Sequence, residues 1–178
     1  RLHMGKSFMF RHNDMASFEN NIKRATKVAE ENGGGVLVIT EGVFGMTGQQ
    51  GTIKEIAAFK QHHKFRPMLD NAHGFGTLGK TGAGAGEEQE CQDEIDVYFS
   101  TFAKSMAGFG AFIAGNAEII RYLKFNLRSQ IFAKSLTMPM VLGGLKRLEL
   151  LRSRPEIKAK LWENVNKLQN GLKERGFD

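Results

Sequence analysis

The sequence has a single cysteine and no hydrophobic run near the ~20 residues with which a helix crosses a membrane. One thiol, at Cys91, excludes an internal disulfide framework and fits a reducing compartment, so we expect a cytoplasmic protein. Internal repeats and low-complexity linkers are also absent. From the lack of a long apolar run we expect no transmembrane segment.

The chain of 178 residues is long enough for one domain with a hydrophobic core. Its net charge is +6, and the basic residues are concentrated toward the C-terminal end. They recur among apolar residues at helical spacing, which favours solvated helix faces over a nucleic-acid-binding stripe, so we expect no nucleic-acid partner. These residues are Arg121, Lys124, Arg128, Lys134, Lys146, Arg147, Arg152, Arg154, Lys158, Lys160, Lys167, Lys173 and Arg175.

Strand-like and helix-like patterns alternate along the chain. Apolar and β-branched runs predict strands at 6–11, 36–40, 65–69, 96–101 and 110–115. Apolar residues at helical spacing predict helices at 14–32, 53–63, 117–127, 139–152 and 155–175. The continuous apolar run at 36–40 is typical of a strand covered on both faces. The alternation predicts an α/β fold with a mostly parallel sheet flanked by helices.

A lysine follows one of the predicted buried strands. Lys104 comes shortly after Val97–Phe99, at the carboxyl edge of the sheet, where α/β proteins place ligands. Partial burial there lowers the pKa of an amine, and a neutral amine can attack a carbonyl. Thr101, three residues earlier, could bind an anion near that amine. The alternative is a lysine at a strand-to-loop junction with its amine in water.

An aspartate and a histidine follow another predicted strand. Asp70 ends the strand at 65–69, and His73 comes three residues later. Because neighbouring parallel strands end at one edge, these side chains and Lys104 are expected to converge there and form a site. Taken without Lys104, the sequence favours an Asp70 that caps the following turn and a His73 with no catalytic task.

Other motifs are weaker. Gly74–Gly79 matches dinucleotide-binding spacing, but no helix pattern begins within the glycines, so positive-φ loop geometry explains them better. His62 and His63 are adjacent and do not face each other in a helix, which argues against metal binding. The acidic loop at 87–96 does not match calcium-loop spacing. We therefore expect no metal site.

Three stretches resemble the α-oxoamine synthases, which are fold-type I pyridoxal-phosphate enzymes. They are Thr40-Glu41-Gly42-Val43-Phe44-Gly45-Met46-Thr47-Gly48, Asp70-Asn71-Ala72-His73-Gly74-Phe75-Gly76-Thr77-Leu78-Gly79 and Ser100-Thr101-Phe102-Ala103-Lys104-Ser105. Within the family, the stretches at 82–88, 93–100 and 128–136 are similar to the bacterial serine palmitoyltransferase branch. The resemblance covers nearly the whole chain and implies the aminotransferase-like large domain of fold-type I.

The resemblance implies a catalytic role for three residues and pyridoxal 5′-phosphate as the cofactor. Lys104 is expected to hold the cofactor covalently and then to act as the base for the substrate α-proton. Asp70 is expected to pair with the pyridine nitrogen and keep it protonated, which preserves the ring as an electron sink. His73 is expected to hydrogen-bond the ring hydroxyl.

The resemblance also implies cofactor contacts from three further residues. Ala72 is expected under the ring face, and Thr101 is expected to bind the phosphate. Ser135 is expected to reach the phosphate site of a partner subunit, because relatives are homodimers with the active site at the interface.

Two positions depart from the family pattern. Gly45 stands where many relatives have serine, so one contact near the ring hydroxyl is expected to be missing. Asn71 replaces the usual second acid after Asp70. The family's ring-stacking histidine and its substrate-carboxylate arginine match no position between residues 1 and 178.

The given sequence is expected to be a fragment, since it starts at Arg1 and relatives are roughly twice as long by the resemblance. Residues 1–152 then form the central part of the cofactor-binding large domain, and residues 153–178 form a helix toward a missing small domain. Alone, this fragment is expected to be inactive.

The resemblance implies a decarboxylating condensation of L-serine with palmitoyl-CoA, a long-chain acyl-CoA, to 3-ketodihydrosphingosine, the first step of sphingolipid synthesis. Sister synthases that use glycine or alanine, namely glycine C-acetyltransferase and 8-amino-7-oxononanoate synthase, are the nearer alternative. A basic, non-enzymatic binding module that uses the C-terminal helices is a more distant one.

Overall fold

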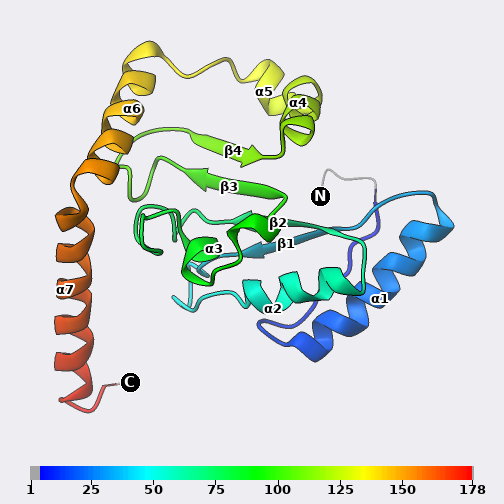
Figure 1. The fold of residues 1–178 in the computed structure, drawn as a ribbon, viewed down its shortest axis with the longest axis horizontal. Coiled ribbons are helices and arrows are strands. Elements are labelled where there is room, and N and C mark those ends of the chain that lie inside the picture. Colours follow the sequence, from blue (N-terminus) through cyan, green and yellow to red (C-terminus); the bar gives the residue numbers. More distant parts are fainter. Residues whose placement is uncertain (1–4, 178) are drawn as a thin grey trace.

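The computed structural model describes residues 5–177, which form a four-stranded sheet with helices around it (Figure 1). The strands are β1 (Leu37–Glu41), β2 (Arg66–Asp70), β3 (Val97–Thr101) and β4 (Ala111–Gly115). The helices are α1 (Met15–Glu31), α2 (Ile53–Ala58), α3 (Ala85–Glu88), α4 (Ala117–Asn126), α5 (Arg128–Phe132), α6 (Met138–Ser153) and α7 (Pro155–Lys173), with short 3-10 turns η1 (Phe59–Gln61) and η2 (Gln92–Glu94).

The strands lie side by side in the order β1-β2-β3-β4. Strands β1, β2 and β3 are parallel, whereas β4 runs antiparallel to β3. The register pairs Glu41 with Asp70, and Asp70 with Phe99. The predicted α/β fold with a mostly parallel sheet is therefore confirmed, and the carboxyl ends of three strands meet at one edge.

One face of the sheet carries the hydrophobic core. Helix α1 starts at the side-chain cap of Asp14, which accepts from the Ser17 N–H at 2.8 Å, and it buries Phe18 and Ile22 against β1. A second cluster packs α2, α3 and the loop after β2 onto β2 and β3; its buried members are Ile53, Leu69, Leu78, Ala85, Cys91 and Tyr98. Burial raises the pKa of the Cys91 thiol, which favours its protonated form.

The opposite face of β1 is open in the part of the chain that the structure describes. Val38 is buried, whereas Leu37 and Ile39 are 52% and 57% exposed. The sequence predicted cover on both faces, and this prediction is wrong for residues 5–177. The alternation in exposure follows from a strand at the sheet edge with helices packed on one side.

The segment at 6–11 forms no strand, contrary to the sequence prediction. Its apolar side chains instead pack on α1: the rings of Phe10 and Phe18 meet edge to face with centroids 5.1 Å apart. The Arg11 N–H donates to the Ser17 hydroxyl at 3.0 Å, and the Arg11 guanidinium pairs with Asp14. The short helices α3 and α5 were also missed, because each holds only one turn or so of helical residues.

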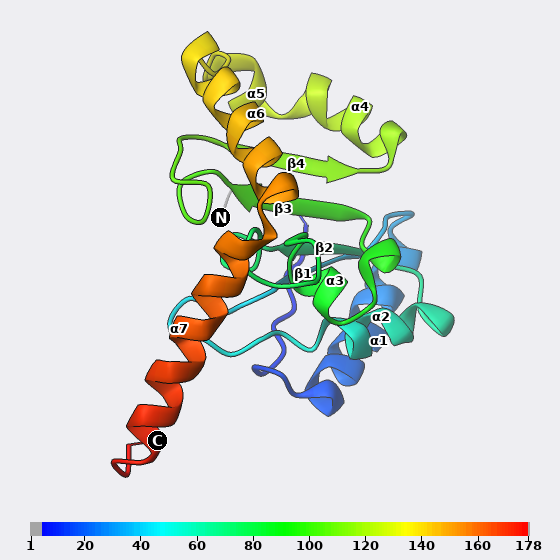
Figure 2. The ribbon, with the colours of Figure 1, turned by 60° about the vertical axis from the view of Figure 1, so that its left-hand side comes forward.

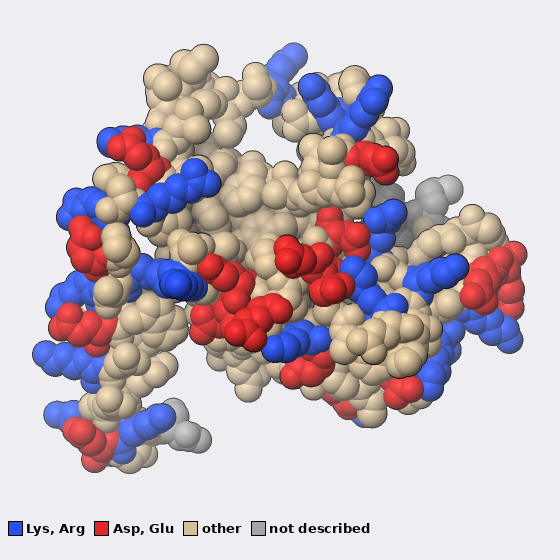
Figure 3. All heavy atoms as spheres, in the orientation of Figure 1, with Lys and Arg blue, Asp and Glu red and all other residues tan. Residues whose placement is uncertain are grey.

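The four C-terminal helices bury no residue completely. Helices α6 and α7 form one continuous arm beside the sheet (Figures 1 and 2). Basic and acidic side chains alternate along this arm (Figure 3), with ion pairs such as Lys146–Glu149 and Lys160–Glu163. This mixture favours the interpretation of the basic residues as solvated helix faces.

The arm contacts the loop that follows β2. The Trp162 indole N–H donates to the Thr77 carbonyl oxygen at 2.8 Å, and the Lys158 ammonium donates to the Gly79 carbonyl oxygen. These contacts join residues more than 75 positions apart. Helix α7 therefore lies against the glycine-rich loop, residues 71–84 between β2 and α3, at the carboxyl edge of the sheet.

Candidate active site

Three loops meet at the carboxyl edge of the parallel strands, one after each strand. The Gly42 N–H donates to the Asp70 carbonyl oxygen at 2.7 Å, which joins the loop after β1 to the end of β2. The Ser105 hydroxyl donates to the Phe75 carbonyl oxygen at 2.6 Å, which joins the loop after β3 to the loop after β2. The loops that carry Asp70, His73 and Lys104 are therefore held against one another.

Asp70 lies partly buried at the end of β2. Its Oδ1 accepts a hydrogen bond from the Ala72 N–H at 3.1 Å, so it caps the following turn, as the more conservative interpretation of the sequence predicted. Its Oδ2 has no partner among the described residues. A carboxylate oxygen with open lone pairs can accept from a cationic N–H, so the turn contact leaves Asp70 able to bind a ligand.

His73 is exposed, and its imidazole lies against the backbone of Gly45 in the loop after β1. A Cβ added at Gly45 would lie 2.7 Å from His73 Nε2. The glycine that departs from the family pattern therefore leaves the room that the imidazole occupies. Ala72, between the two site residues, is buried.

Lys104 is exposed, so the partial burial predicted from the sequence is wrong. It lies in a tight turn closed by a hydrogen bond from the Ala107 N–H to its carbonyl oxygen at 3.0 Å. None of the ion pairs between described residues involves its ammonium group. The amine is thus accessible and carries no carboxylate partner, as a group that reacts with a carbonyl requires.

The turn that carries Lys104 packs against the glycine-rich loop. A Cβ added at Gly76, which has φ +78°, would lie 2.6 Å from the Ser105 Oγ. Only glycine combines this backbone conformation with such a close approach. Positive φ at Gly76 and Gly79, and a helix α3 that begins only at Ala85, argue for loop geometry, and the dinucleotide interpretation fails.

Thr101 lies at the end of β3, but its hydroxyl is used inside the turn. Its Oγ1 donates to the Gly110 carbonyl oxygen at 2.9 Å and accepts from the Ala103 N–H at 3.1 Å. An anion can take the hydroxyl proton only where the bond to Gly110 opens. Thr101 therefore lies beside the turn that carries Lys104, and its hydroxyl proton is already donated to the Gly110 carbonyl oxygen.

Ser135 is exposed in the segment between α5 and α6. No described contact brings it to Asp70, His73 or Lys104. Its neighbour Leu136 lies close to Gly110, where an added Cβ would be 2.7 Å from the leucine Cδ2. The structure therefore places Asp70, Ala72, His73, Thr101 and Lys104 on loops that contact one another at this edge, and leaves Ser135 outside them.

Sequence reasoning gave no role to Asn71, which the structure places between the loop after β2, strand β3 and the start of α3. Its side chain is fully buried and bonded to Tyr98, which burial holds neutral by raising the pKa of the phenol to about 12. The available signal was the set of glycines that surround the amide, Gly42, Gly74 and Gly84. Each lacks the side chain that would collide with Asn71.

The acidic residues around the glycine-rich loop bind backbone N–H groups. Glu87 accepts from Thr81 N–H at 3.0 Å and from Ala83 N–H at 3.1 Å, and Glu88 accepts from Gly79 N–H at 2.8 Å. Carboxylates in such bonds fix the shape of the loop. Between residues 5 and 177, no group of three or more His, Cys, Asp or Glu side chains is arranged to hold a metal ion.

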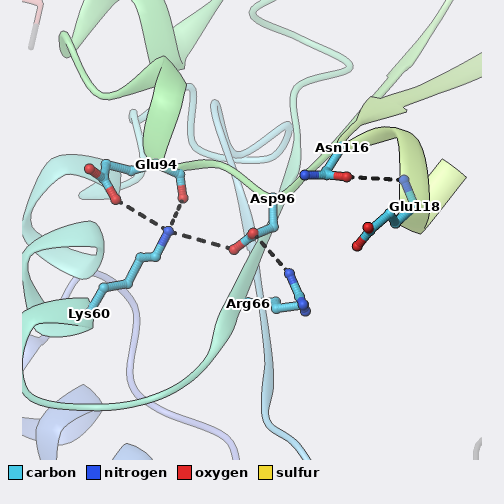
Figure 4. Close-up of polar contacts among 6 residues, drawn as sticks. All are labelled: Lys60, Arg66, Glu94, Asp96, Asn116 and Glu118. Atoms are coloured by element: carbon cyan, nitrogen blue, oxygen red, sulfur yellow. Dashed lines mark hydrogen bonds and ion pairs between the residues drawn. The ribbon is translucent and has the colours of Figure 1, made fainter.

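The opposite edge of the sheet carries an ion-paired cluster (Figure 4). Asp96, just before β3, pairs with Arg66 at 3.2 Å and with Lys60 at 3.6 Å, and Lys60 also pairs with Glu94 at 3.2 Å. These four residues connect the end of η1 to the starts of β2 and β3. Their charges neutralise one another, which leaves no unpaired group for chemistry.

Comparison with known proteins places this arrangement in a family. The family model described as "Aminotransferase class I and II" matches residues 1–178. The chain is 65% identical over its whole length to a cysteate-C-fatty acyltransferase of Capnocytophaga ochracea, of which it covers 42%. It is 35% identical to a serine palmitoyltransferase of Sphingobacterium spiritivorum, of which it covers 43%.

Solved structures agree with this placement. The serine palmitoyltransferase of Sphingomonas wittichii matches with a TM-score of 0.86 and 30% identity over 95% of this chain and 41% of that one. The chain thus spans less than half the length of these relatives. It belongs to the aminotransferase class I and II family, and within that family to the α-oxoamine synthases.

Proposed function

We propose that the protein containing this chain is a pyridoxal-phosphate-dependent acyltransferase. It condenses an amino acid with a fatty acyl thioester, with loss of carbon dioxide. The proposal is supported by the contacts that hold the loops carrying Asp70, His73 and Lys104 against one another at one sheet edge. Family membership and solved relatives that hold this cofactor support it.

The residues present fit pyridoxal 5′-phosphate. The unpaired Lys104 amine suits an aldehyde, and the open Oδ2 of Asp70 suits a protonated pyridine nitrogen. His73 offers an imidazole to a ring hydroxyl, and the small side chain of Ala72 lies between Asp70 and His73 in the same loop. Thr101 offers a hydroxyl for the phosphate once its bond to Gly110 opens. When bound, the cofactor supplies an electron sink.

With the cofactor bound, three residues of this chain would act on it and on the substrate. Asp70 would keep the pyridine nitrogen protonated and so maintain its positive charge. Lys104 would hold the cofactor through its amine and would take the substrate α-proton as a general base. His73 would hydrogen-bond the ring hydroxyl and help to orient the ring.

L-cysteate is the amino acid that the comparisons favour. The relative at 65% identity carries that substrate in its name, whereas the serine palmitoyltransferases are near 35%. L-serine with palmitoyl-CoA is the second candidate, as expected from the sequence motifs. A glycine or alanine substrate is a third, given the 33% identity to an 8-amino-7-oxononanoate synthase of Fervidobacterium nodosum.

Further properties follow from family resemblance and remain part of the proposal. The protein is a cytoplasmic homodimer, with Ser135 reaching the phosphate site of the other subunit. Residues 1–152 belong to the large domain, α7 leads to a small domain, and residues 1–178 alone are inactive. None of the helices that the structure describes is long and apolar enough to cross a membrane.

Absorption spectroscopy and turnover test this function. The full-length protein is expected to show the visible absorption band of lysine-bound cofactor, and Lys104→Ala is expected to abolish it. Lys80→Ala, at an exposed lysine in the neighbouring loop, serves as the control and keeps the band. Turnover is then compared with cysteate, serine, glycine and alanine and with long- and short-chain acyl-CoA. An unchanged Lys104→Ala spectrum contradicts the proposal.

A further inference from the structure

We propose that Asn71 is a positioning residue for the cofactor site, and that its position requires a neutral amide in place of an acid. The inference rests on the proposed function, because Asn71 holds Asp70, Ala72 and His73 where a cofactor ring would meet them. Asn71 itself is fully buried and faces away from the open side of the site.

Every polar atom of the Asn71 side chain has a partner. Nδ2 donates to the Tyr98 hydroxyl oxygen and, at 3.2 Å, to the Ala83 carbonyl oxygen. Oδ1 accepts from the Ala85 N–H at 3.2 Å. The backbone N–H donates to the Phe99 carbonyl oxygen at 2.8 Å. One residue thus joins β3, the glycine-rich loop and the start of α3.

Three glycines close around the amide. A Cβ added at Gly42 would lie 2.5 Å from Asn71 Oδ1, and a Cβ at Gly74 or Gly84 would overlap the amide as well. The amide therefore fills the point at which the loop after β1 and both ends of the glycine-rich loop meet. Asp70 and Ala72 flank it directly in the chain, so their positions depend on it.

The hydrogen-bond roles require a donor at this position. The Ala83 carbonyl oxygen accepts from the Tyr98 hydroxyl at 2.6 Å. Because Tyr98 gives its only proton to Ala83, its oxygen is an acceptor toward Asn71. An ionised carboxylate at position 71 donates nothing, and it would face two acceptor oxygens without water. A protonated carboxyl could restore one of the two donated bonds.

The segments that meet at Asn71 also carry other titratable groups. These lie on each element that packs around it: Glu41 at the end of β1, Asp70 and His73 on its own loop, Glu87 on α3 and Tyr98 on β3. Three of these groups are carboxylates, and Tyr98 is neutral. Together their charges disfavour a further negative charge at position 71.

The test compares Asn71→Asp with Asn32→Asp in the full-length protein. Asn32 is an exposed amide that donates to the Val28 carbonyl oxygen at 2.7 Å, so the same chemical change occurs there in solvent. The dissociation constant for pyridoxal 5′-phosphate is measured between about pH 6 and pH 9, because a buried carboxyl protonates within this range. The melting temperature of the cofactor-free protein is measured in parallel.

Asn71→Asp is expected to weaken cofactor binding about ten- to a hundredfold at the alkaline end and to recover most of it at the acidic end. Asn32→Asp is expected to match the wild type throughout. A wild-type protein that binds no cofactor contradicts the proposed function instead. Asn71→Asp binding equal to the wild type at every pH overturns the inference, as does a loss that is independent of pH and parallels the melting temperature.

Tyr98→Phe covers the case in which Asn71→Asp does not fold. This change introduces no charge and removes the oxygen that accepts from Asn71 Nδ2. Cofactor binding is expected to weaken about fivefold at all pH values, as for one lost hydrogen bond. Binding as tight as in the wild type would show that the amide does not need its partner, and would overturn the inference.

Discussion

In the part of the chain that the structure describes, charged side chains are ion-paired at the amino edge of the parallel sheet and are not ion-paired at its carboxyl edge. At the amino edge, Arg66 and Asp96 pair with each other, and Lys60 adds a second cation to the cluster. At the carboxyl edge, Asp70 and Lys104 form no ion pair with any described residue, and backbone hydrogen bonds and a buried amide hold their loops. The comparison teaches that ion pairs join the segments at one edge, whereas the charged groups Asp70 and Lys104 at the other edge have no ion-pair partner among the described residues.

Asp70→Asn should have the largest effect on this contrast. It removes the carboxylate that we propose pairs with the pyridine nitrogen, and it keeps the side-chain volume. Turnover of the full-length protein is expected to fall at least about a hundredfold, the range for loss of a group that controls a proton. Asp96→Asn at the other edge is the matched control, with steady-state turnover as the measurement. Equal losses in both variants would contradict the contrast.

Gly45→Ser should have a smaller effect at the same edge. The new Cβ displaces the imidazole of His73, since it would lie 2.7 Å from Nε2. Because that ring is exposed and can rotate away, we expect kcat/KM to fall about tenfold while the melting temperature changes little. Gly35→Ser, at a glycine with open space around it, should change neither quantity. A large drop in melting temperature would argue for a packing role instead.

The buried phenol at the carboxyl edge predicts a pH dependence of stability. Burial raises the pKa of Tyr98 from 10.0 to about 12, so the folded state keeps a proton that the unfolded state loses. The free energy of unfolding should therefore fall as pH rises from about 10 to about 12, and it should be independent of Tyr98 at lower pH. Denaturant titrations of wild type and Tyr98→Phe check this prediction. The prediction is refuted if the free energy of unfolding of the wild type falls no more steeply with pH in this range than that of Tyr98→Phe.

The ion-paired edge should give the smallest effect. Arg66 is mostly exposed, and exposed ion pairs contribute about 1 kcal/mol or less. Arg66→Gln is expected to lower the free energy of unfolding by no more than that amount, with the loss shrinking at high salt. Cofactor affinity should remain unchanged. A change in affinity would show that the two edges are coupled.

The sequence predicted that the loops carrying Asp70, His73 and Lys104 lie at one edge, because parallel strands end there, and this follows from strand order alone. That their side chains form one cofactor site stays a prediction. It also predicted the mostly parallel sheet from the alternation of apolar patterns. The sequence left open whether the Lys104 amine is partly buried or in water, since its exposure depends on how the nine residues between β3 and β4 leave the sheet. The position of Ser135 also could not be predicted from the sequence, because long-range packing of the chain sets it.

The role of Asn71 escaped prediction for a related reason. An Asn after a strand is usually a turn residue, and its burial arises only when three distant glycines close on it. The 6–11 segment was assigned to a strand because a short apolar run fits either a sheet or packing against a helix such as α1. In both cases the sequence pattern covers a few neighbouring residues, whereas the residues that pack against them lie elsewhere in the chain.

Borohydride reduction of the full-length protein with pyridoxal 5′-phosphate, followed by peptide mass spectrometry, tests the central claim most directly. Reduction makes the bond between the cofactor and its lysine permanent, so the modified residue can be read from the peptide masses. The account predicts a single cofactor adduct on Lys104. An adduct on Lys80 or on another lysine, with Lys104 unmodified, would contradict it.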